Sequence, residues 1–352
     1  MSVYGGDSIS DLIFGDHGLD LLKDLQDWSP ELDLFFKLIT LFGETAIIIA
    51  IVASIYWAIN KRGAIGLAFV LAIGGYLNTF FKGVIGLERP FQSHGQEVKK
   101  IGTADGYSFP SGHSEATGAF WAYSSLEAKD SSALAQRSKY AIYGASIAFI
   151  ILVPLSRVYL GVHWPGDAFV GAIEGILIAL ALFWGMPKAW LFLEKMSDRE
   201  QSLALVGVTL LMAFTSTLVT SISGNDVLTA ANWELPGALA GFAIGLILEK
   251  HYVRFEVPGA NQKRKIALRL IMGLLLLVAV YYGSKIIASP FEDIELLADI
   301  PETTLMLPLD YLRLFLVGLT AAFGIPWCFL QLEKKLGIYG SVIDREEPNI
   351  EI

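Results

Sequence analysis

The 352-residue sequence is poor in charge and in cysteine. Only 17% of its residues are charged and 54% are hydrophobic, whereas soluble domains usually carry about 25% charged residues. The single cysteine, Cys328, excludes an intramolecular disulfide framework and a cysteine-based metal site. There is no Asn-x-Ser/Thr acceptor for glycosylation, which favours a bacterial or archaeal source. This composition predicts a protein that spans a membrane several times.

Long apolar runs recur along the chain. A helix that crosses a bilayer needs about 20 mostly apolar residues. Scanning at that length gives nine candidate spans, at residues 38–59, 64–82, 113–127, 140–158, 167–186, 202–222, 235–249, 266–288 and 309–331. The span at 113–127 is short and begins with polar residues. Residues 11–37 place leucines at helical spacing among Asp and Lys, which is typical of an interfacial helix. We therefore expect an all-α, polytopic membrane helical bundle.

Lys and Arg residues indicate the orientation, because short cytoplasmic loops are enriched in them. They gather after the first, third, fifth and seventh candidate spans, whereas residues 223–234 and 289–308 contain none. This pattern predicts an N-terminus outside and a C-terminus in the cytoplasm, in the inner membrane of a prokaryotic cell. The main exceptions on the outer side are Lys82, Arg89, Lys99, Lys100 and Arg157. We expect the chemistry of the protein in the segments that carry these exceptions.

Three outward-facing segments carry polar residues at a similar expected depth. KGVIGLERP (82–90) ends the second span, PSGH (110–113) opens the third, and SRVYLGVHWPGD (156–167) links the fourth to the fifth. Together they contain three cations, two histidines and an aspartate. Such a set is typical of a phosphate-handling site with a nucleophile.

The spacing of these residues resembles the three-part signature of the type 2 phosphatidic acid phosphatase family. That signature has Lys, six residues and Arg-Pro, then Pro-Ser-Gly-His, then Ser-Arg, five residues, His, three residues and Asp, and every position is filled here. The resemblance covers roughly residues 30–186. It implies a six-helix phosphatase core, shared with vanadium haloperoxidases and glucose-6-phosphatase, followed here by additional C-terminal transmembrane helices. We divide the chain into an N-terminal interfacial segment (1–37), a catalytic core (38–186) and an accessory transmembrane region (187–352).

The resemblance also implies a role for each signature residue. His163 would attack phosphorus to give a phosphohistidine, and Asp167 would fix the tautomer of its ring. His113 would protonate the leaving oxygen and then activate water. The groups that would bind the phosphate are Lys82, Arg89, Ser111, Gly112 and Arg157, of which Ser111 and Gly112 stand where a helix begins. No metal ion and no other cofactor is implied.

Several residues outside the signature are also polar or aromatic at expected span positions. Glu174 is expected to hydrogen-bond between helices as a neutral acid. Asn78, one turn before the signature lysine, either braces that lysine or joins helices. Glu115 is expected to contact a neighbouring span or the substrate entrance rather than phosphorus. Tyr159 and Trp164 are expected to be anchors at the membrane interface.

The leading interpretation is a phosphatase that acts on a lipid phosphate in the outer leaflet, because a site near headgroup depth suits a lipid that enters sideways. A sugar phosphate from the outer aqueous side and an isoprenyl diphosphate are the alternative substrates. A transporter is the alternative from another class, and it predicts paired broken helices and repeats. The expected partners are a phosphorylated lipid or other phosphomonoester and membrane lipids, with no nucleic acid, and the oligomeric state is left open.

Overall fold

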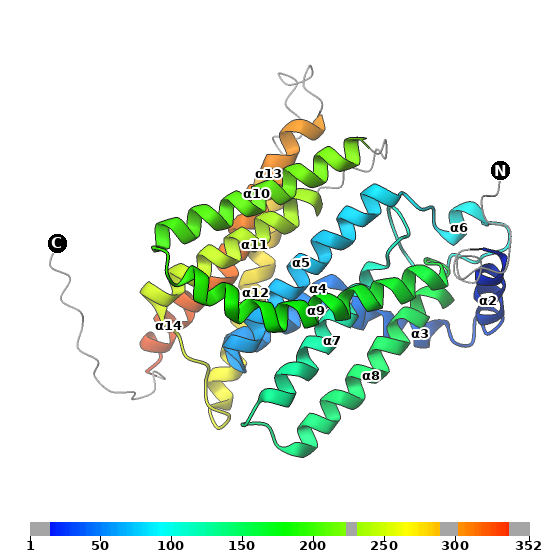
Figure 1. The fold of residues 1–352 in the computed structure, drawn as a ribbon. Helices are drawn as coiled ribbons and strands as arrows, with labels where there is room; N and C mark the ends of the chain where they lie inside the picture. The colour runs from blue at the N-terminus through cyan, green and yellow to red at the C-terminus, as the bar shows by residue number, and fades with distance from the viewer. Residues whose placement is uncertain (1–14, 223–230, 289–301, 338–352) are drawn as a thin grey trace.

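The structure, a computed structural model, describes residues 15–222, 231–288 and 302–337. Every regular element within these ranges is a helix, with no strand among them. Figure 1 shows long helices packed against one another, with the short helices α2 (Asp16–Gln26) and α6 (Pro90–Ser93) at the end of the bundle nearest the N-terminus. The expected all-α bundle is confirmed.

The first half of the chain forms the helices that carry the signature segments. After α2 these are α3 (Asp33–Thr40), the short η1 (Leu41–Gly43), α4 (Thr45–Ala58), α5 (Lys61–Ile85), α6, α7 (Gly112–Asp130), α8 (Gln136–Tyr159) and α9 (Pro165–Leu193). The predicted spans at 64–82, 113–127, 140–158 and 167–186 correspond to α5, α7, α8 and α9.

The second half adds a further group of long helices. These are α10 (Asp198–Ile222), α11 (Ala231–Leu248) with the π-helical turn η2 (Glu249–Val253), α12 (Lys263–Ala288), α13 (Glu302–Leu319), the π-helical turn η5 (Thr320–Gly324) and α14 (Ile325–Lys335). The last three follow one another without a break, and they cover the predicted span at 309–331.

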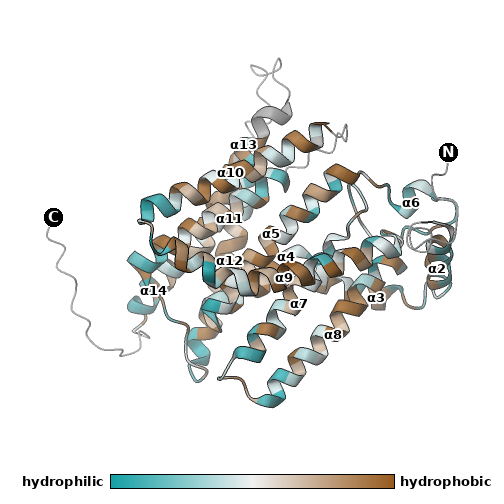
Figure 2. Ribbon diagram, viewed as in Figure 1, coloured by the Kyte–Doolittle hydropathy of each residue, from teal (hydrophilic) through white to brown (hydrophobic). Residues whose placement is uncertain are grey.

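Six helical segments of the described residues are long and apolar enough to cross a membrane. They are Lys61–Ser93, Gln136–Tyr159, Pro165–Leu193, Asp198–Val219, Lys263–Ile287 and Leu307–Lys335. Helices α7 and α11 are helical as expected, but they are not among the six. Figure 2 shows hydrophobic residues along the bodies of the long helices and hydrophilic residues at the adjoining ends of α7 and α8. The chain is therefore a polytopic membrane protein.

The predicted span at 38–59 is divided between two helices, which together are long and apolar enough for a span. α3 and η1 end at Gly43, α4 begins two residues later, and the two parts are bent by 50°. Glu44 between them has an extended backbone (φ −72°, ψ 122°). A Cβ on Gly43 would lie 2.8 Å from Val153 Cγ1 and 2.9 Å from the carbonyl oxygen of His113. The break is thus held directly against α7 and α8.

Helix α7 has weak hydropathy because it is buried among other helices. It contacts α5, α8 and α9, and its Ser114, Glu115 and Thr117 side chains are buried. α9 comes very close, since a Cβ on Gly175 would lie 2.0 Å from the carbonyl oxygen of Glu115. Small residues are what permit such an approach between membrane helices. A helix with little lipid contact can therefore carry polar residues that a lipid-facing helix excludes.

Helix α2 packs on the end of the bundle that carries the signature segments. Leu19 and Leu22 are buried, and they form one apolar cluster with Val98, Val158 and Trp164. The leucine face that the sequence assigned to a membrane interface is therefore used for packing within the protein.

Buried polar contacts attach the second half of the chain to the first. Arg269 of α12 donates from Nε to Glu333 Oε1 of α14 at 2.7 Å, and from Nη1 to the carbonyl oxygen of Trp57 in α4 at 3.1 Å. Lys61, the first residue of α5, pairs with Glu249 at 2.6 Å. Side-chain contacts, and not only the connecting chain, therefore hold the additional helices against the first half.

We expect Gly175→Ala to destabilise the protein, because its methyl group has no room between α9 and α7. Overpacking of this kind costs about 1–3 kcal/mol. Gly185→Ala is a matched control on the same helix, since a Cβ there meets no atom within 4 Å. The measurement is the thermal unfolding midpoint of both variants in detergent. Equal midpoints would contradict the close packing of α7 and α9.

Candidate active site

The fold brings the signature segments together at one end of the bundle. Lys82 lies in the last turn of α5, Arg89 precedes α6, His113 is in the first turn of α7, and Arg157 is in the last turn of α8. His163 lies in the turn between α8 and α9. A cavity of about 290 Å³ is lined by Lys82, Arg89, Thr103, Ala104, Asp105, Gly112, His113, Arg157 and His163. Six of the eight predicted site residues therefore line one cavity.

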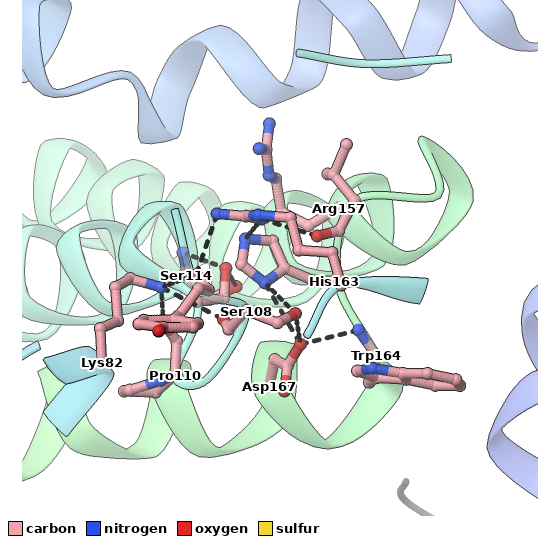
Figure 3. Close-up of polar contacts among 12 residues, drawn as sticks. Lys82, Ser108, Pro110, Ser114, Arg157, His163, Trp164 and Asp167 are labelled. Carbon is pink, nitrogen blue, oxygen red and sulfur yellow. Dashed lines mark hydrogen bonds and ion pairs between the residues drawn. The ribbon is translucent and has the colours of Figure 1, made fainter. Parts of the chain in front are cut away.

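Asp167 lies behind His163 and holds its ring. The two are joined between Nδ1 and Oδ2 at 3.3 Å (Figure 3). The Asp167 side chain is fully buried. The same Oδ2 accepts hydrogen bonds from the backbone N–H of Trp164 at 2.8 Å and from the hydroxyl of Ser108. A carboxylate at Nδ1 favours the tautomer that carries its proton there, which leaves a lone pair on Nε2. Ser108 was not predicted from the sequence.

The environment of His163 favours the neutral imidazole. Burial lowers the pKa of this ring well below its usual range, and the positive charges of Arg89, Lys82 and Arg157 act in the same direction. Its Nε2 lies 3.1 Å from Arg89 Nη1. With its proton on Nδ1, the ring accepts this hydrogen bond from Arg89 through the Nε2 lone pair. A neutral imidazole that carries its lone pair on the cavity side can act as a nucleophile once that lone pair turns from Arg89 to a substrate.

A tight turn places Arg157 and His163 on the same cavity. Gly161 within this turn has φ +72°, and a Cβ there would lie 2.2 Å from the carbonyl oxygen of Lys99, so glycine is the residue that fits. Gln26 at the end of α2 braces the turn, because its Nε2 donates to the carbonyl oxygens of Lys99 and Tyr159 at 2.7 and 3.0 Å. The N-terminal helix thus helps to position the turn that carries His163, a role that its sequence did not reveal.

Lys82 and Arg89 hold the segment that runs along the cavity. The Lys82 ammonium donates to the carbonyl oxygens of Tyr107, Ser108 and Pro110 at 3.0, 3.2 and 2.6 Å. The Arg89 guanidinium donates to those of Asp105, Gly106, Tyr107 and Val162 at 2.7, 2.9, 3.0 and 2.7 Å. Both cations therefore shape the backbone of the site and place their positive charge beside the cavity.

Arg157 is the cation with a spare donor. Its Nη1 donates to the hydroxyl of Thr40 at 2.8 Å and its Nη2 to the carbonyl oxygen of Thr103 at 3.4 Å. Its Nε is buried and has no hydrogen-bond partner among the residues that the structure describes. A buried N–H without a partner is costly. Because Arg157 lines the cavity, an anion that reaches its guanidinium there would be a favourable acceptor.

His113 pairs with a residue that the sequence analysis did not select. Its Nε2 lies 3.1 Å from Oε2 of Glu44, at the break in the first span. The Glu44 side chain is 47% exposed and that of His113 is 23% exposed. The two histidines of the cavity therefore have different carboxylate partners, Asp167 deep in the protein and Glu44 near its surface.

The two remaining predicted residues, Ser111 and Gly112, differ in position. Gly112 lines the cavity as the first residue of α7, so the positive end of that helix lies at the cavity. Ser111 is fully buried, and its hydroxyl oxygen accepts hydrogen bonds from Ser114 N at 3.4 Å and Ser114 Oγ at 3.0 Å. Ser111 thus caps the helix, and it is not among the residues that line the cavity.

A second polar layer lies behind the cavity. Asn78 donates to Glu174 Oε2 and to the carbonyl oxygen of Pro110, both at 3.4 Å, so it bridges α9 to the segment that Lys82 holds. Glu115 is 2% exposed, and its carboxyl faces α5, where a Cβ on Gly74 would lie 2.0 Å from Oε1. The expected contact of Glu115 with a neighbouring span is confirmed.

Tyr159 and Trp164 are buried rather than exposed at an interface, so that expectation is wrong. Tyr159 is 0% and Trp164 5% exposed. The hydroxyl of Tyr159 donates to Asp33 Oδ1 at 2.8 Å, and the indole N–H of Trp164 donates to the carbonyl oxygen of Glu88 at 3.0 Å. Their polar groups fix the ends of α8 and α9 to other segments of the protein.

Comparisons with known proteins agree with the signature. Residues 63–191 match the PAP2 superfamily, and residues 233–337 match the transmembrane extension of PAP2 superfamily phosphatases. The lipid A 1-phosphatase of Rhizobium johnstonii is 32% identical over 118 residues, which are 32% of this chain and 44% of the relative. The chain thus spans less than half the length of this curated relative. The crystal structure of a PAP2-type phosphatidylglycerolphosphate phosphatase from Bacillus subtilis is similar with a TM-score of 0.42 and 20% identity, over 49% of this chain and 88% of that one.

We expect Arg157→Lys to weaken the binding of inorganic phosphate, because lysine keeps the charge but lacks the Nε donor. Losing one charge-assisted hydrogen bond of roughly 1.5 kcal/mol raises the Kd about tenfold. Arg137→Lys is the matched control, since Arg137 is exposed at the opposite end of the same helix. The Kd is measured by isothermal titration calorimetry in detergent. Equal values for wild type and both variants would contradict the assignment of a spare donor to Arg157.

Proposed function

The chain belongs to the PAP2 superfamily, and we propose that it is an integral membrane phosphatase that hydrolyses a lipid phosphate monoester. The observation that carries this proposal is the position of His163, which Asp167 holds beside three cations that line the same cavity. The similar lipid A 1-phosphatase overlaps the chain over 118 residues, which supports a phosphorylated lipid as the substrate.

The first step forms a phosphohistidine. The Nε2 lone pair of His163 forms a bond to phosphorus, and the bond from phosphorus to the alcohol oxygen breaks. The electron pair of that bond stays on the alcohol oxygen, which takes the proton of the His113 imidazolium and leaves as the alcohol. The charge of the phosphoryl oxygens is balanced by Lys82, Arg89 and Arg157, whose fixed positions favour the transition state.

The second step releases phosphate. The neutral His113 takes a proton from a water molecule as its oxygen bonds to phosphorus, and the bond between phosphorus and Nε2 breaks. The electron pair returns to His163, and His113 is again an imidazolium. The sum of the two steps is one ester and one water converted to one alcohol and one phosphate. Because the three cations supply the positive charge, the proposed reaction uses no metal ion.

The proposal places the site on the extracytoplasmic side of a prokaryotic inner membrane, with the N-terminus outside. The charge pattern of the sequence supports this orientation. The Lys- and Arg-rich connections follow α4, α7 and α9, at helix ends away from the cavity, and such connections are typical of the cytoplasmic side. We keep 38–186 as the catalytic core and 187–352 as an accessory region. The two separate family matches support this division.

The setting of the cavity, at one end of a bundle of membrane helices, favours a lipid as the substrate. About 290 Å³ lies at the lower limit of small-molecule pockets, and a phosphoryl group with the first atoms of its alcohol fits within it. The rest of the substrate would then lie outside the cavity, and a lipid chain has the bilayer to occupy there. A sugar ring or a second phosphate would need additional polar contacts at the mouth.

The purified protein is expected to release phosphate from phosphatidate in EDTA and to be inhibited by vanadate. Glucose 6-phosphate and isoprenyl diphosphate are tested beside it as the alternative substrates. His163→Ala should lower the rate by a factor on the order of 10⁴ or more, as loss of a nucleophile does. His251→Ala is the control, because His251 is 41% exposed and pairs with Asp198, and neither residue lines the cavity. Hydrolysis of the sugar phosphate alone would overturn the lipid proposal, and full activity of His163→Ala would overturn the nucleophile.

A further inference from the structure

The proposed reaction needs its two histidines in opposite protonation states. His163 has to be neutral to attack phosphorus, and His113 has to be protonated to release the alcohol. Both rings line the same cavity with Lys82, Arg89 and Arg157. Burial and nearby positive charge favour the neutral form of any imidazole, so the surroundings shared by the two rings suit His163 and oppose the task of His113. A contact specific to His113 has to oppose that preference.

The charged and titratable groups around His113 come from several elements. They are Glu44 at the break of the first span, Lys82 of α5, Arg89 before α6, Asp105 in the following segment, Arg157 of α8, His163 in the α8–α9 turn and, on α7 itself, Glu115. The carboxylate in hydrogen-bond contact with the ring is that of Glu44, at 3.1 Å. Glu115 faces Gly74 on α5. Among the described residues, the side chain of Asp105 makes no hydrogen bond to His113.

The break in the first span is what brings Glu44 to the ring. Gly43 packs against the carbonyl oxygen and Cβ of His113, so the residue that follows it is placed beside the imidazole. One turn earlier, the hydroxyl of Thr40 accepts a hydrogen bond from Arg157. The broken span thus presents two polar side chains, four residues apart, to two residues of the cavity. A continuous helix would not bend by 50° at this position.

Glu44 and Asp167 act on their histidines in different surroundings. Asp167 Oδ2 also accepts hydrogen bonds from Ser108 and from the backbone of Trp164, which spread its charge over three donors. Glu44 Oε2 has His113 as its partner among the described residues, and its half-exposed carboxylate remains ionised in contact with water. Its charge is therefore available to stabilise an imidazolium.

We propose that Glu44 is a positioning residue that stabilises the protonated form of His113 and so supports its role as the general acid of the reaction. This inference rests on the proposed phosphatase function. Glu44 remains a carboxylate throughout: the proton that reaches the alcohol oxygen comes from His113, and the attacking water returns it to His113. The paired carboxylates thus separate the two histidines into a nucleophile and an acid.

Glu44→Gln tests this role with two substrates that differ in their need for an acid. An alkyl phosphate, such as a short-chain phosphatidate, leaves as a strongly basic alkoxide and needs the proton. The phenolate of p-nitrophenyl phosphate is a weak base and leaves without it. We expect kcat/KM to fall roughly tenfold or more for the alkyl phosphate and to change less than about twofold for p-nitrophenyl phosphate.

The matched control is Glu97→Gln, since Glu97 is also a half-exposed carboxylate, 50% exposed and paired with Lys23 rather than with a cavity residue. Both substrates should be hydrolysed at the wild-type rate by this variant. Equal losses on both substrates in Glu44→Gln would overturn the proposal, because a merely structural role affects them alike. If the wild type hydrolyses neither substrate, the proposed function itself fails, which is a different result.

The pH profile gives a second readout. A carboxylate stabilises the imidazolium, so without it His113 loses its proton at a lower pH. For the alkyl phosphate, the decline of kcat/KM on the alkaline side should therefore begin at a lower pH in Glu44→Gln than in the wild type or Glu97→Gln. An alkaline decline at the same pH in all three proteins would contradict the proposal.

Discussion

The buried carboxylate of Asp167 is the interaction on which the rest of the site depends. Its Oδ2 is bonded to His163, to the hydroxyl of Ser108 and to the backbone of Trp164, and its own carbonyl oxygen accepts the N–H of Ser111 at 3.0 Å. One residue therefore joins the turn that carries His163, the segment before α7, and the starts of α7 and α9. A fully buried carboxylate is stable only with such donors, so the chemistry and the packing of this region share the same contacts.

The three cations carry the same charge, but they differ in their hydrogen-bond partners. Lys82 and Arg89 donate to backbone carbonyls, and so they hold the loop while they supply positive charge. Arg157 keeps an Nε without a partner among the described residues and is the one prepared to bind a further oxygen. The histidines are divided similarly by Asp167 and Glu44. Residues of the same type in this site therefore differ in role because they have different hydrogen-bond partners.

Sequence patterns predicted the features that depend on local spacing. The apolar runs located the long helices. The signature predicted that His113, His163 and Arg157 lie together, and all three line one cavity. Glu44, Ser108 and Gln26 were missed because each contacts residues 55 to 133 positions away, and no local pattern marks such contacts. The break at residue 44 was also missed, since apolar residues continue on both sides of it. The weak hydropathy of α7 reflects burial among helices, which a composition scan does not detect.

The most direct test of the account is to locate the phosphoryl group during turnover. The protein is mixed with a lipid phosphate, quenched within milliseconds in alkali, which preserves phosphohistidine, and its peptides are analysed by mass spectrometry. The proposed mechanism predicts a phosphoryl group on the peptide that contains His163, at its Nε2. A phosphoryl group on another residue of the cavity, such as His113, would contradict it.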